Sequence, residues 1–478
     1  MTKQTRTILF IFFVLLFVLT VIPTIFYAQG YRFDTEHWRI VKTGALFLSV
    51  RPQPVRIVVD DKAIETTNFF FRNAFLSDLL PKTYRVEALR DGYYSWHKEL
   101  DVTPGNVTKA FAVRLFAQNP RNQIVRENVS SFFPADNGVA AIISTTVEEN
   151  STTLWLYLHE AKQVGEIVKL QAGEQVQKVV WSHDTAQVLI VLKKGNEVRA
   201  LVGSTLAPHT FSFITSFLTP SLLKTFGQQD ARLQWGYDGA TLYVVIPGPS
   251  GATKTTDELY LINLISHTVK GPILDEIHDF LVLKNGVYTI EGPGGTFVRY
   301  STDLATFEQI SPKPYPGDIA VPLRLTFEEE TFFIIQSSNL FIYEEGKKEF
   351  SFVETDVVSV AIHPDKKKLA IQKEHEILLY WLQEVVTAPK HKKGEIELVL
   401  RLSTPIEHMT WLSPYEYLAI TTGDALQIVE IDPRDGKNIL TYDQFASLDP
   451  ISWYKKNKSF LLLQKKDLIE LFIEQTAS

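Results

Sequence analysis

The longest apolar run of the chain lies near its N-terminus. Residues Ile8 to Ala28 include no charged side chain, and only Thr20, Pro23 and Thr24 interrupt the apolar pattern. At 1.5 Å per residue, a helix of this length extends over about 30 Å, the thickness of the hydrocarbon core of a bilayer. The pattern therefore predicts one transmembrane helix that contacts membrane lipid through Ile8 to Ala28.

This segment could be an uncleaved signal anchor or a cleaved export signal. Lys3 and Arg6 precede it without an acidic residue, which suits both. Cleavage after Ala28 would place the bulky Phe26 at a position that prefers a small residue. We therefore expect an anchor, with the N-terminus in the cytoplasm and the bulk of the chain outside. Basic residues also follow the segment, so the distribution of Lys and Arg separates the two sides only weakly.

Residues 44–117 alternate between apolar and polar positions, as half-buried strands do. Turn residues separate the runs at Asp60-Asp61-Lys62 and at Asp91-Gly92. Five or six strands in about 70 residues predict a small β-sandwich. The expected strands are 45–50, 55–59, 84–89, 96–102 and 109–115.

The same stretch resembles the PEGA domain, a short β-sandwich module of bacterial and archaeal surface proteins. The residues that carry the resemblance are Ser49-Val50-Arg51-Pro52 before Val55 to Val59, Asp60-Asp61-Lys62, Leu80-Pro81 before Tyr84-Arg85-Val86, Gly92-Tyr93, and the lead-in Gly30-Tyr31-Arg32-Phe33-Asp34 with Thr43-Gly44. The chain departs from the family where Pro52-Gln53-Pro54-Val55 replaces Pro-Glu-Gly-Ala and where Lys82 replaces a turn glycine. The resemblance implies a surface or scaffold role and no catalytic residue.

From residue 118 onward one pattern recurs: an apolar run that ends at an anchor residue, a polar turn, and further apolar runs. The anchors recur about every 46 residues, a period typical of a β-propeller with four strands per repeat. The turns Trp181-Ser182-His183-Asp184 and His363-Pro364-Asp365 resemble those of TolB-type and WD-repeat propellers. Seven or eight blades are expected. The eight anchors are Phe133, Trp181, Trp235, Phe280, Leu325, Ala361, Trp411 and Trp453.

Too few residues follow the last anchor, Trp453, to complete a four-stranded blade. We predict that a strand from Gln123 to Val129 supplies the fourth strand and closes the ring. The complete prediction is all-β, with a tail and anchor at 1–28, a juxtamembrane linker at 29–43, a PEGA-like sandwich at 44–117 and a propeller at 118–478.

Composition then narrows the chemistry. The 48 Lys and Arg against 55 Asp and Glu give a net charge of −7 without long basic runs, which argues against a nucleic-acid partner. The chain has no cysteine. This excludes disulfides, zinc–thiolate sites, iron–sulfur clusters and thiol catalysis. In an exported chain of this size, it also favours a bacterial envelope.

No group of residues predicts a catalytic, cofactor or metal site. Three histidines precede an acid, at His183-Asp184, His278-Asp279 and His363-Pro364-Asp365, and we interpret them mainly as turn residues. A solvated turn is expected at Glu328-Glu329-Glu330, and a turn is expected at the faintly calcium-loop-like Asp432 to Gly436. Solubilising loops are expected at Lys366-Lys367-Lys368, Lys392-Lys393 and Lys455-Lys456, with binding of an acidic glycan or lipid head group as the alternative. Core or membrane-proximal packing is expected for Phe69-Phe70-Phe71 and Phe75.

The predicted function is that of a membrane-anchored envelope protein whose propeller binds a protein or a cell-wall glycan. Two alternatives stay open. One is an envelope hydrolase or lyase with a site at the mouth of the propeller channel. The other is an accessory subunit of an export or envelope-assembly machine.

Overall fold

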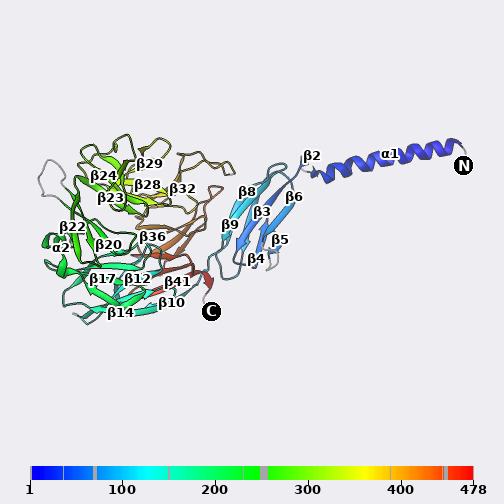
Figure 1. Ribbon diagram of the computed structural model, residues 1–478. Helices are drawn as coiled ribbons and strands as arrows, with labels where there is room; N and C mark the ends of the chain where they lie inside the picture. Colours follow the sequence, from blue (N-terminus) through cyan, green and yellow to red (C-terminus); the bar gives the residue numbers. More distant parts are fainter. Residues whose placement is uncertain are drawn as a thin grey trace. The chain divides into compact units, whose positions relative to one another are not determined.

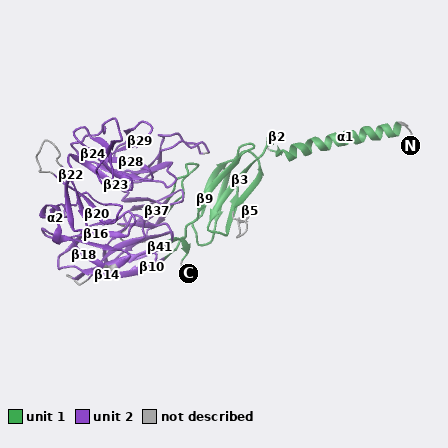
Figure 2. Cartoon of the chain, viewed as in Figure 1, with its two compact units in different colours: residues 1–121, 429–440, 472–478 green, residues 122–428, 441–471 purple. Residues whose placement is uncertain are grey.

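The computed structural model describes residues 3–35, 37–67, 73–148, 151–229, 231–247, 257–387, 389–443, 445 and 450–476. In these residues most of the regular secondary structure after one long N-terminal helix is β-strand (Figure 1). Two compact units are present (Figure 2). The first comprises residues 1–121, 429–440 and 472–478, and the second comprises residues 122–428 and 441–471.

The first unit begins with the apolar helix α1 (Lys3–Ala28). This helix is long and apolar enough to cross a membrane, and none of its apolar window is buried in the protein. A hairpin of two short strands follows, β1 (Tyr31–Asp34) and β2 (Arg39–Lys42).

Two sheets then pack face to face. One has the strand order β6-β3-β9 and the other β5-β4-β7-β8, and they share one apolar core that includes Leu48, Ile57, Val86 and Trp96. All five expected strands are present, and β5 and β6 add to them. The strands are β3 (Gly44–Arg51), β4 (Val55–Val59), β5 (Lys62–Thr67), β6 (Ala74–Leu79), β7 (Thr83–Leu89), β8 (Trp96–Asp101) and β9 (Val107–Arg114).

The turn predicted at Asp60-Asp61-Lys62 is present between β4 and β5. Asp60 and Asp61 both have positive φ, 47° and 63°, as the central residues of a tight hairpin turn require. Asp60 Oδ1 accepts a hydrogen bond from the backbone N–H of Arg85 at 3.1 Å, and Asp60 Oδ2 pairs with Lys82 Nζ at 2.7 Å. The turn is thereby fixed to the neighbouring strand β7.

Eight four-stranded sheets follow along residues 120–476, within the part of the chain that the structure describes. They are the blades of a β-propeller, and their number agrees with the eight anchors. Blades 1 to 4 are β11 (Val129–Pro134), β12 (Ala140–Glu148), β13 (Ser151–Leu158), β14 (Gln163–Lys169); β15 (Gln175–Trp181), β16 (Gln187–Lys194), β17 (Glu197–Ser204), β18 (Ala207–Phe213); β19 (Leu233–Trp235), β20 (Thr241–Ile246), β21 (Glu258–Asn263), β22 (Thr268–Leu274); and β23 (Ile277–Leu283), β24 (Gly286–Glu291), β25 (Thr296–Tyr300), β26 (Phe307–Gln309).

The remaining blades have the same order, except that the last takes one strand from the start of the repeat region. Blades 5 to 8 are β27 (Arg324–Glu328), β28 (Thr331–Gln336), β29 (Asn339–Glu344), β30 (Glu349–Glu354); β31 (Ser359–Ile362), β32 (Lys368–Gln372), β33 (Glu376–Trp381), β34 (Ile396–Arg401); β35 (His408–Trp411), β36 (Tyr417–Thr422), β37 (Ala425–Glu430), β38 (Ile439–Tyr442); and β39 (Ser452–Tyr454), β40 (Ser459–Gln464), β41 (Asp467–Thr476) with β10 (Pro120–Arg126).

Every predicted anchor lies in the first strand of its blade. First strands of successive blades contact one another, for example β15 with β19 and β23 with β27, so they are the inner strands. Trp235 Nε1 donates to the carbonyl oxygen of Val180 in the preceding blade at 2.9 Å. Trp411 Nε1 donates to that of Ala361 in the same way, also at 2.9 Å. The anchors therefore join neighbouring blades, as the repeat pattern indicated.

The ring closes through β10, which lies next to β41 in the order β10-β41-β40-β39. The closing strand was predicted at 123–129 and is found at 120–126. Val129 belongs to β11 instead, because the left-handed Asn128 (φ 57°) breaks the strand before it. Blade 2 is linked to blade 3 by a 3₁₀ turn, η1 (Thr215–Phe217), and a short helix, α2 (Pro220–Phe226).

Candidate functional site

A hollow opens on one face of the propeller. In an antiparallel blade, the turn between the first and second strands and the turn between the third and fourth lie at the same end. Turns of this kind from blades 3 to 6 surround a hollow of about 890 Å³. They include Lys284-Asn285 of blade 4, Glu329-Glu330 of blade 5 and Lys366 of blade 6.

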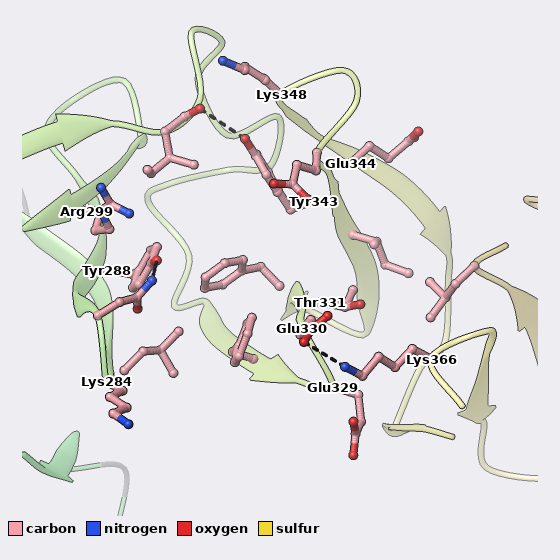
Figure 3. A pocket seen from close by; sticks show the side chains of 18 of the residues that line it. Lys284, Tyr288, Arg299, Glu329, Glu330, Thr331, Tyr343, Glu344, Lys348 and Lys366 are labelled. Atoms are coloured by element: carbon pink, nitrogen blue, oxygen red, sulfur yellow. Dashed lines mark hydrogen bonds and ion pairs between the residues drawn. The ribbon is translucent and has the colours of Figure 1, made fainter. Parts of the chain in front are cut away.

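Aromatic rings form much of the wall, and hydrogen bonds hold two of them in place (Figure 3). Asn285 Nδ2 donates to the hydroxyl oxygen of Tyr288 at 2.9 Å. The Tyr343 hydroxyl donates to the carbonyl oxygen of Ile310 at 3.1 Å. Burial, together with the charge of nearby Glu345, raises the pKa of Tyr343, so this hydroxyl stays protonated at neutral pH. The complete aromatic lining is Tyr237, Tyr288, Phe327, Phe332, Tyr343 and Tyr380.

Charges of both signs line the same hollow in equal number. Lys366 Nζ pairs with Glu330 Oε1 at 2.8 Å, and Arg299 pairs with Glu308 at 2.5 Å. Lys284 makes no ion pair in the described part of the chain and is exposed. The basic residues are Lys284, Arg299, Lys348, Lys366 and Lys393, and the acidic ones are Glu308, Glu329, Glu330, Glu344 and Glu345.

The acidic run at the end of β27 is less solvated than its sequence indicates. Glu330 is exposed, as expected, but Glu328 and Glu329 are half-buried. Burial raises the pKa of Glu328 to about 7; a backbone hydrogen bond from Ile362 lowers it, and the charges of Glu329 and Asp136 raise it further. The expectation of a fully solvated turn is therefore wrong for Glu328, because the first strand carries it against the neighbouring blade.

The three histidines next to acids belong to different blades, 2, 4 and 6, and each contacts different residues. The His183 ring stacks on Tyr237, with 4.0 Å between ring centroids. His278 lies in strand β23 rather than in a turn, and its Nε2 is 2.8 Å from the carbonyl oxygen of Gly292. His363 occupies the first turn of blade 6, 2.9 Å from Asp365.

Three side chains of the types that bind metal ions lie close together, although one of them is distant from the other two in the sequence. His363, Asp365 and Glu416 have donor atoms close enough to hold a metal ion. However, the buried ammonium of Lys368 lies 3.0 Å from Asp365 Oδ2 and 2.7 Å from Glu416 Oε2. A lysine therefore already supplies the positive charge that a cation would bring.

The loop from Asp432 to Gly436, which faintly resembled a calcium site, is also contacted by a lysine, Lys98. Within the first unit, Lys98 Nζ donates to the backbone carbonyl oxygens of Asp432 at 3.2 Å and Gly436 at 2.8 Å. It also pairs with Glu430 Oε2 at 3.2 Å, and both side chains are almost fully buried. The turn prediction agrees with this geometry, whereas no sequence pattern pointed to Lys98.

The lysine-rich loops have different surroundings. Lys366 and Lys393 line the hollow, which their interpretation as solubilising residues did not foresee, whereas Lys456 pairs with Glu160 at the surface. Phe75 lies outside the core, because it is 55% exposed and pairs across the sheet with Phe47. Phe69-Phe70-Phe71 lie outside the described residues.

Sequence reasoning missed most of the hollow's lining, including Tyr288, Tyr343 and Lys284. What these residues share is that they lie at or near the turns between the first and second, or the third and fourth, strands of successive blades. That signal becomes visible only when each repeat is divided into its four strands.

No protein-family model and no curated protein sequence matches the chain. Among solved structures, it is similar to a β-propeller domain from Myceliophteria thermophila, with 9% identity and a TM-score of 0.40 over 74% of this chain and 99% of that one. It is also similar to an oligogalacturonate lyase from Vibrio parahaemolyticus, with 9% identity and a TM-score of 0.37 over 68% and 94% of the two chains. A prolyl endopeptidase shares 12% identity with a TM-score of 0.40 over 66% and 50%. These likenesses concern the propeller fold alone.

Proposed function

We propose that the chain is a single-pass membrane protein of a bacterial cell envelope whose propeller binds a segment of a partner protein. The observation that carries the binding role is the hollow of about 890 Å³ with its aromatic and charged lining. Pockets of this size with a few placed polar groups are typical binding sites. The apolar helix α1 supports the anchor, and the absence of cysteine supports the bacterial envelope.

The charge balance favours a protein segment over a cell-wall glycan. The cations and carboxylates of the lining are equal in number, so no excess of positive charge selects an acidic glycan, and a neutral glycan would leave Lys284 without a charged partner. A peptide segment offers both signs of charge together with apolar side chains. An accessory role in an export or assembly machine is one form of this proposal, since the partner would then be a subunit of that machine.

An envelope hydrolase or lyase is the second candidate, and Glu328 is the observation that favours it. A carboxyl group with a pKa of about 7 suits general acid or base catalysis. Glu328 does not belong to the lining of the hollow, and its charged neighbours, Glu329 and Asp136, are themselves carboxylates. The binding role is therefore preferred.

Site-specific photo-crosslinking in native membranes tests the proposal. A photoreactive amino acid replaces Lys284 in the hollow, and the control replaces Asn196, an exposed residue in a turn at the opposite end of blade 2. We expect a discrete protein adduct from position 284 and none from position 196. Recovery of cell-wall fragments without a protein adduct would favour the glycan instead. Equal labelling from both positions would contradict the site.

A further inference from the structure

The hairpin that follows α1 carries an exposed apolar face. Phe33 and Ile40 are partners across the two strands, so their side chains lie on the same side. Trp38 packs edge-on against Phe33, with 5.8 Å between ring centroids. Phe33, Trp38 and Ile40 are 51%, 83% and 61% exposed.

The opposite side of the hairpin is polar and attached to the protein. Asp34 is buried and lies within 3.6 Å of Arg39 Nε, its partner across the strands. Arg32 pairs with Asp78 of β6 at 2.7 Å. One face of the hairpin is therefore fixed to the sandwich, and the other presents three large apolar side chains to the surroundings.

The hairpin is also fastened to the end of the helix. The Arg32 guanidinium lies 3.6 Å from the centre of the Tyr27 ring and donates to the Tyr27 carbonyl oxygen at 2.9 Å. Tyr31 packs edge-on against Phe26. The backbone N–H of Thr43 donates to the carbonyl oxygen of Gly30 at 2.8 Å, which closes the base of the hairpin. The position of the helix end therefore determines where the hairpin lies.

Trp38 is unfavourable in water on two counts. It exposes a large indole, and its φ of 50° places a bulky residue in the left-handed region. Strained residues that persist indicate a function, and tryptophan is enriched where a membrane meets water.

From these contacts we propose that the face formed by Phe33, Trp38 and Ile40, here called the hairpin face, binds the surface of the lipid bilayer beside the end of α1. This inference rests on the membrane anchoring proposed above. An apolar stretch of about 30 Å fills the hydrocarbon core, so a hairpin that starts at Tyr31 begins within the head-group layer. The exposed basic residue Lys42 lies on the same side of β2 as Ile40, where anionic head groups attract it. The hairpin then braces the first unit against the bilayer.

The chain has no cysteine, so single cysteines can be introduced and labelled without removing native ones. Ile40→Cys and Arg39→Cys are matched neighbours in β2, similarly exposed and on opposite faces. Each full-length variant carries an environment-sensitive fluorophore and is reconstituted in vesicles of phosphatidylethanolamine and phosphatidylglycerol. Quenching is measured with a lipid nitroxide placed just below the head groups and with aqueous iodide.

We expect the label at position 40 to be quenched several-fold more by the shallow nitroxide than the label at position 39, and several-fold less by iodide. Equal behaviour of the two labels would overturn the inference. A third variant, Leu15→Cys in α1, separates the two proposals by means of a deep nitroxide. Deep quenching at 15 with equal behaviour at 39 and 40 rejects the hairpin face alone. No deep quenching at 15 rejects the membrane anchoring and the hairpin face together.

Discussion

At the scale of single residues, the most consequential side chains are ionised groups buried in pairs. Lys98 and Glu430 form such a pair in the first unit, and the Trp96 indole N–H also donates to Glu430 at 2.8 Å. Removing one member of a buried pair leaves the other charge without compensation, which is more damaging than losing an exposed pair. Their value for stability can therefore be measured by comparing matched variants.

We predict that Lys98→Met lowers the free energy of unfolding by about 3–5 kcal/mol. The double variant Lys98→Met/Glu430→Gln should recover part of this loss, because no buried charge then stays uncompensated. The control is Lys82→Met, which removes the exposed pair with Asp60 and should cost at most about 1 kcal/mol. Denaturant unfolding of the full chain in detergent measures these values, and hydrogen exchange in β8 assigns the transition. Equal losses for Lys98→Met and Lys82→Met would contradict the prediction.

The protonation of Glu470 makes the stability of the fold depend on pH. Burial acts to raise the pKa of its carboxyl, but hydrogen bonds from His159 and Ser459 outweigh burial and lower the pKa from its ordinary 4.5 to about 2. A lowered pKa stabilises the fold above the unfolded value and loses that contribution as pH falls through the folded value.

Stability should therefore fall by about 3 kcal/mol between pH 4.5 and pH 2 because Glu470 takes up a proton. In Glu470→Gln this part of the decline should be absent, and stability at pH 7 should be lower from the start. Glu160→Gln is the control, since that carboxylate is exposed. Unfolding curves across this pH range test it, and an unchanged slope in Glu470→Gln would rule it out.

At the scale of elements, the closing strand β10 joins the two ends of the propeller. Val125 packs against an apolar cluster that includes Val129 and Phe132 of blade 1 and Leu461 of blade 8. Its neighbour Ile124 is exposed. Substitutions of these two residues therefore distinguish the contribution of ring closure to the free energy of unfolding from the contribution of strand propensity.

Val125→Ala should lower the free energy of unfolding by about 1–2 kcal/mol, because it removes partly buried methyl groups at the closure. Ile124→Ala should change it by less than about 0.5 kcal/mol. Thermal unfolding of the full chain compares the two variants. A larger loss in Ile124→Ala would mean that β10 does not close the ring in the observed register.

At the scale of the whole molecule, the propeller brings turns from four successive blades, 3 to 6, to one face, where the proposed binding surface lies. Capture of the partner should fall several-fold in Lys284→Glu, because the lining loses a cation and gains a like charge beside its carboxylates. Lys194→Glu, at the end of β16 and at the other end of blade 2, makes the same charge change away from the hollow and should leave capture intact. Quantitative crosslinking in membranes compares the two, and equal losses would point to net charge rather than to the hollow.

Much of the architecture was predictable because it depends on short-range patterns. The period of the anchors reflects the need to bury one inner residue per blade, and it placed Trp181, Trp235 and Trp411 in first strands as found. Strand ends were less predictable, since the left-handed Asn128 moved the closing strand by three residues. The aromatic and charged lining was not foreseen, because each side chain taken singly looks like an ordinary turn or strand residue.

The sequence by itself determined the apolar helix, the two β regions and the repeat of about 46 residues, because hydrophobic periodicity acts between residues near in the chain. Only the tertiary structure decided which polar groups meet. Lys98 bonds to Asp432 across 334 positions and His159 to Glu470 across 311, and no local pattern records such a pairing. The hollow, the lysine that replaces a cation beside His363, and the exposed hairpin face all arise in the same way, from residues whose proximity depends on the completed fold.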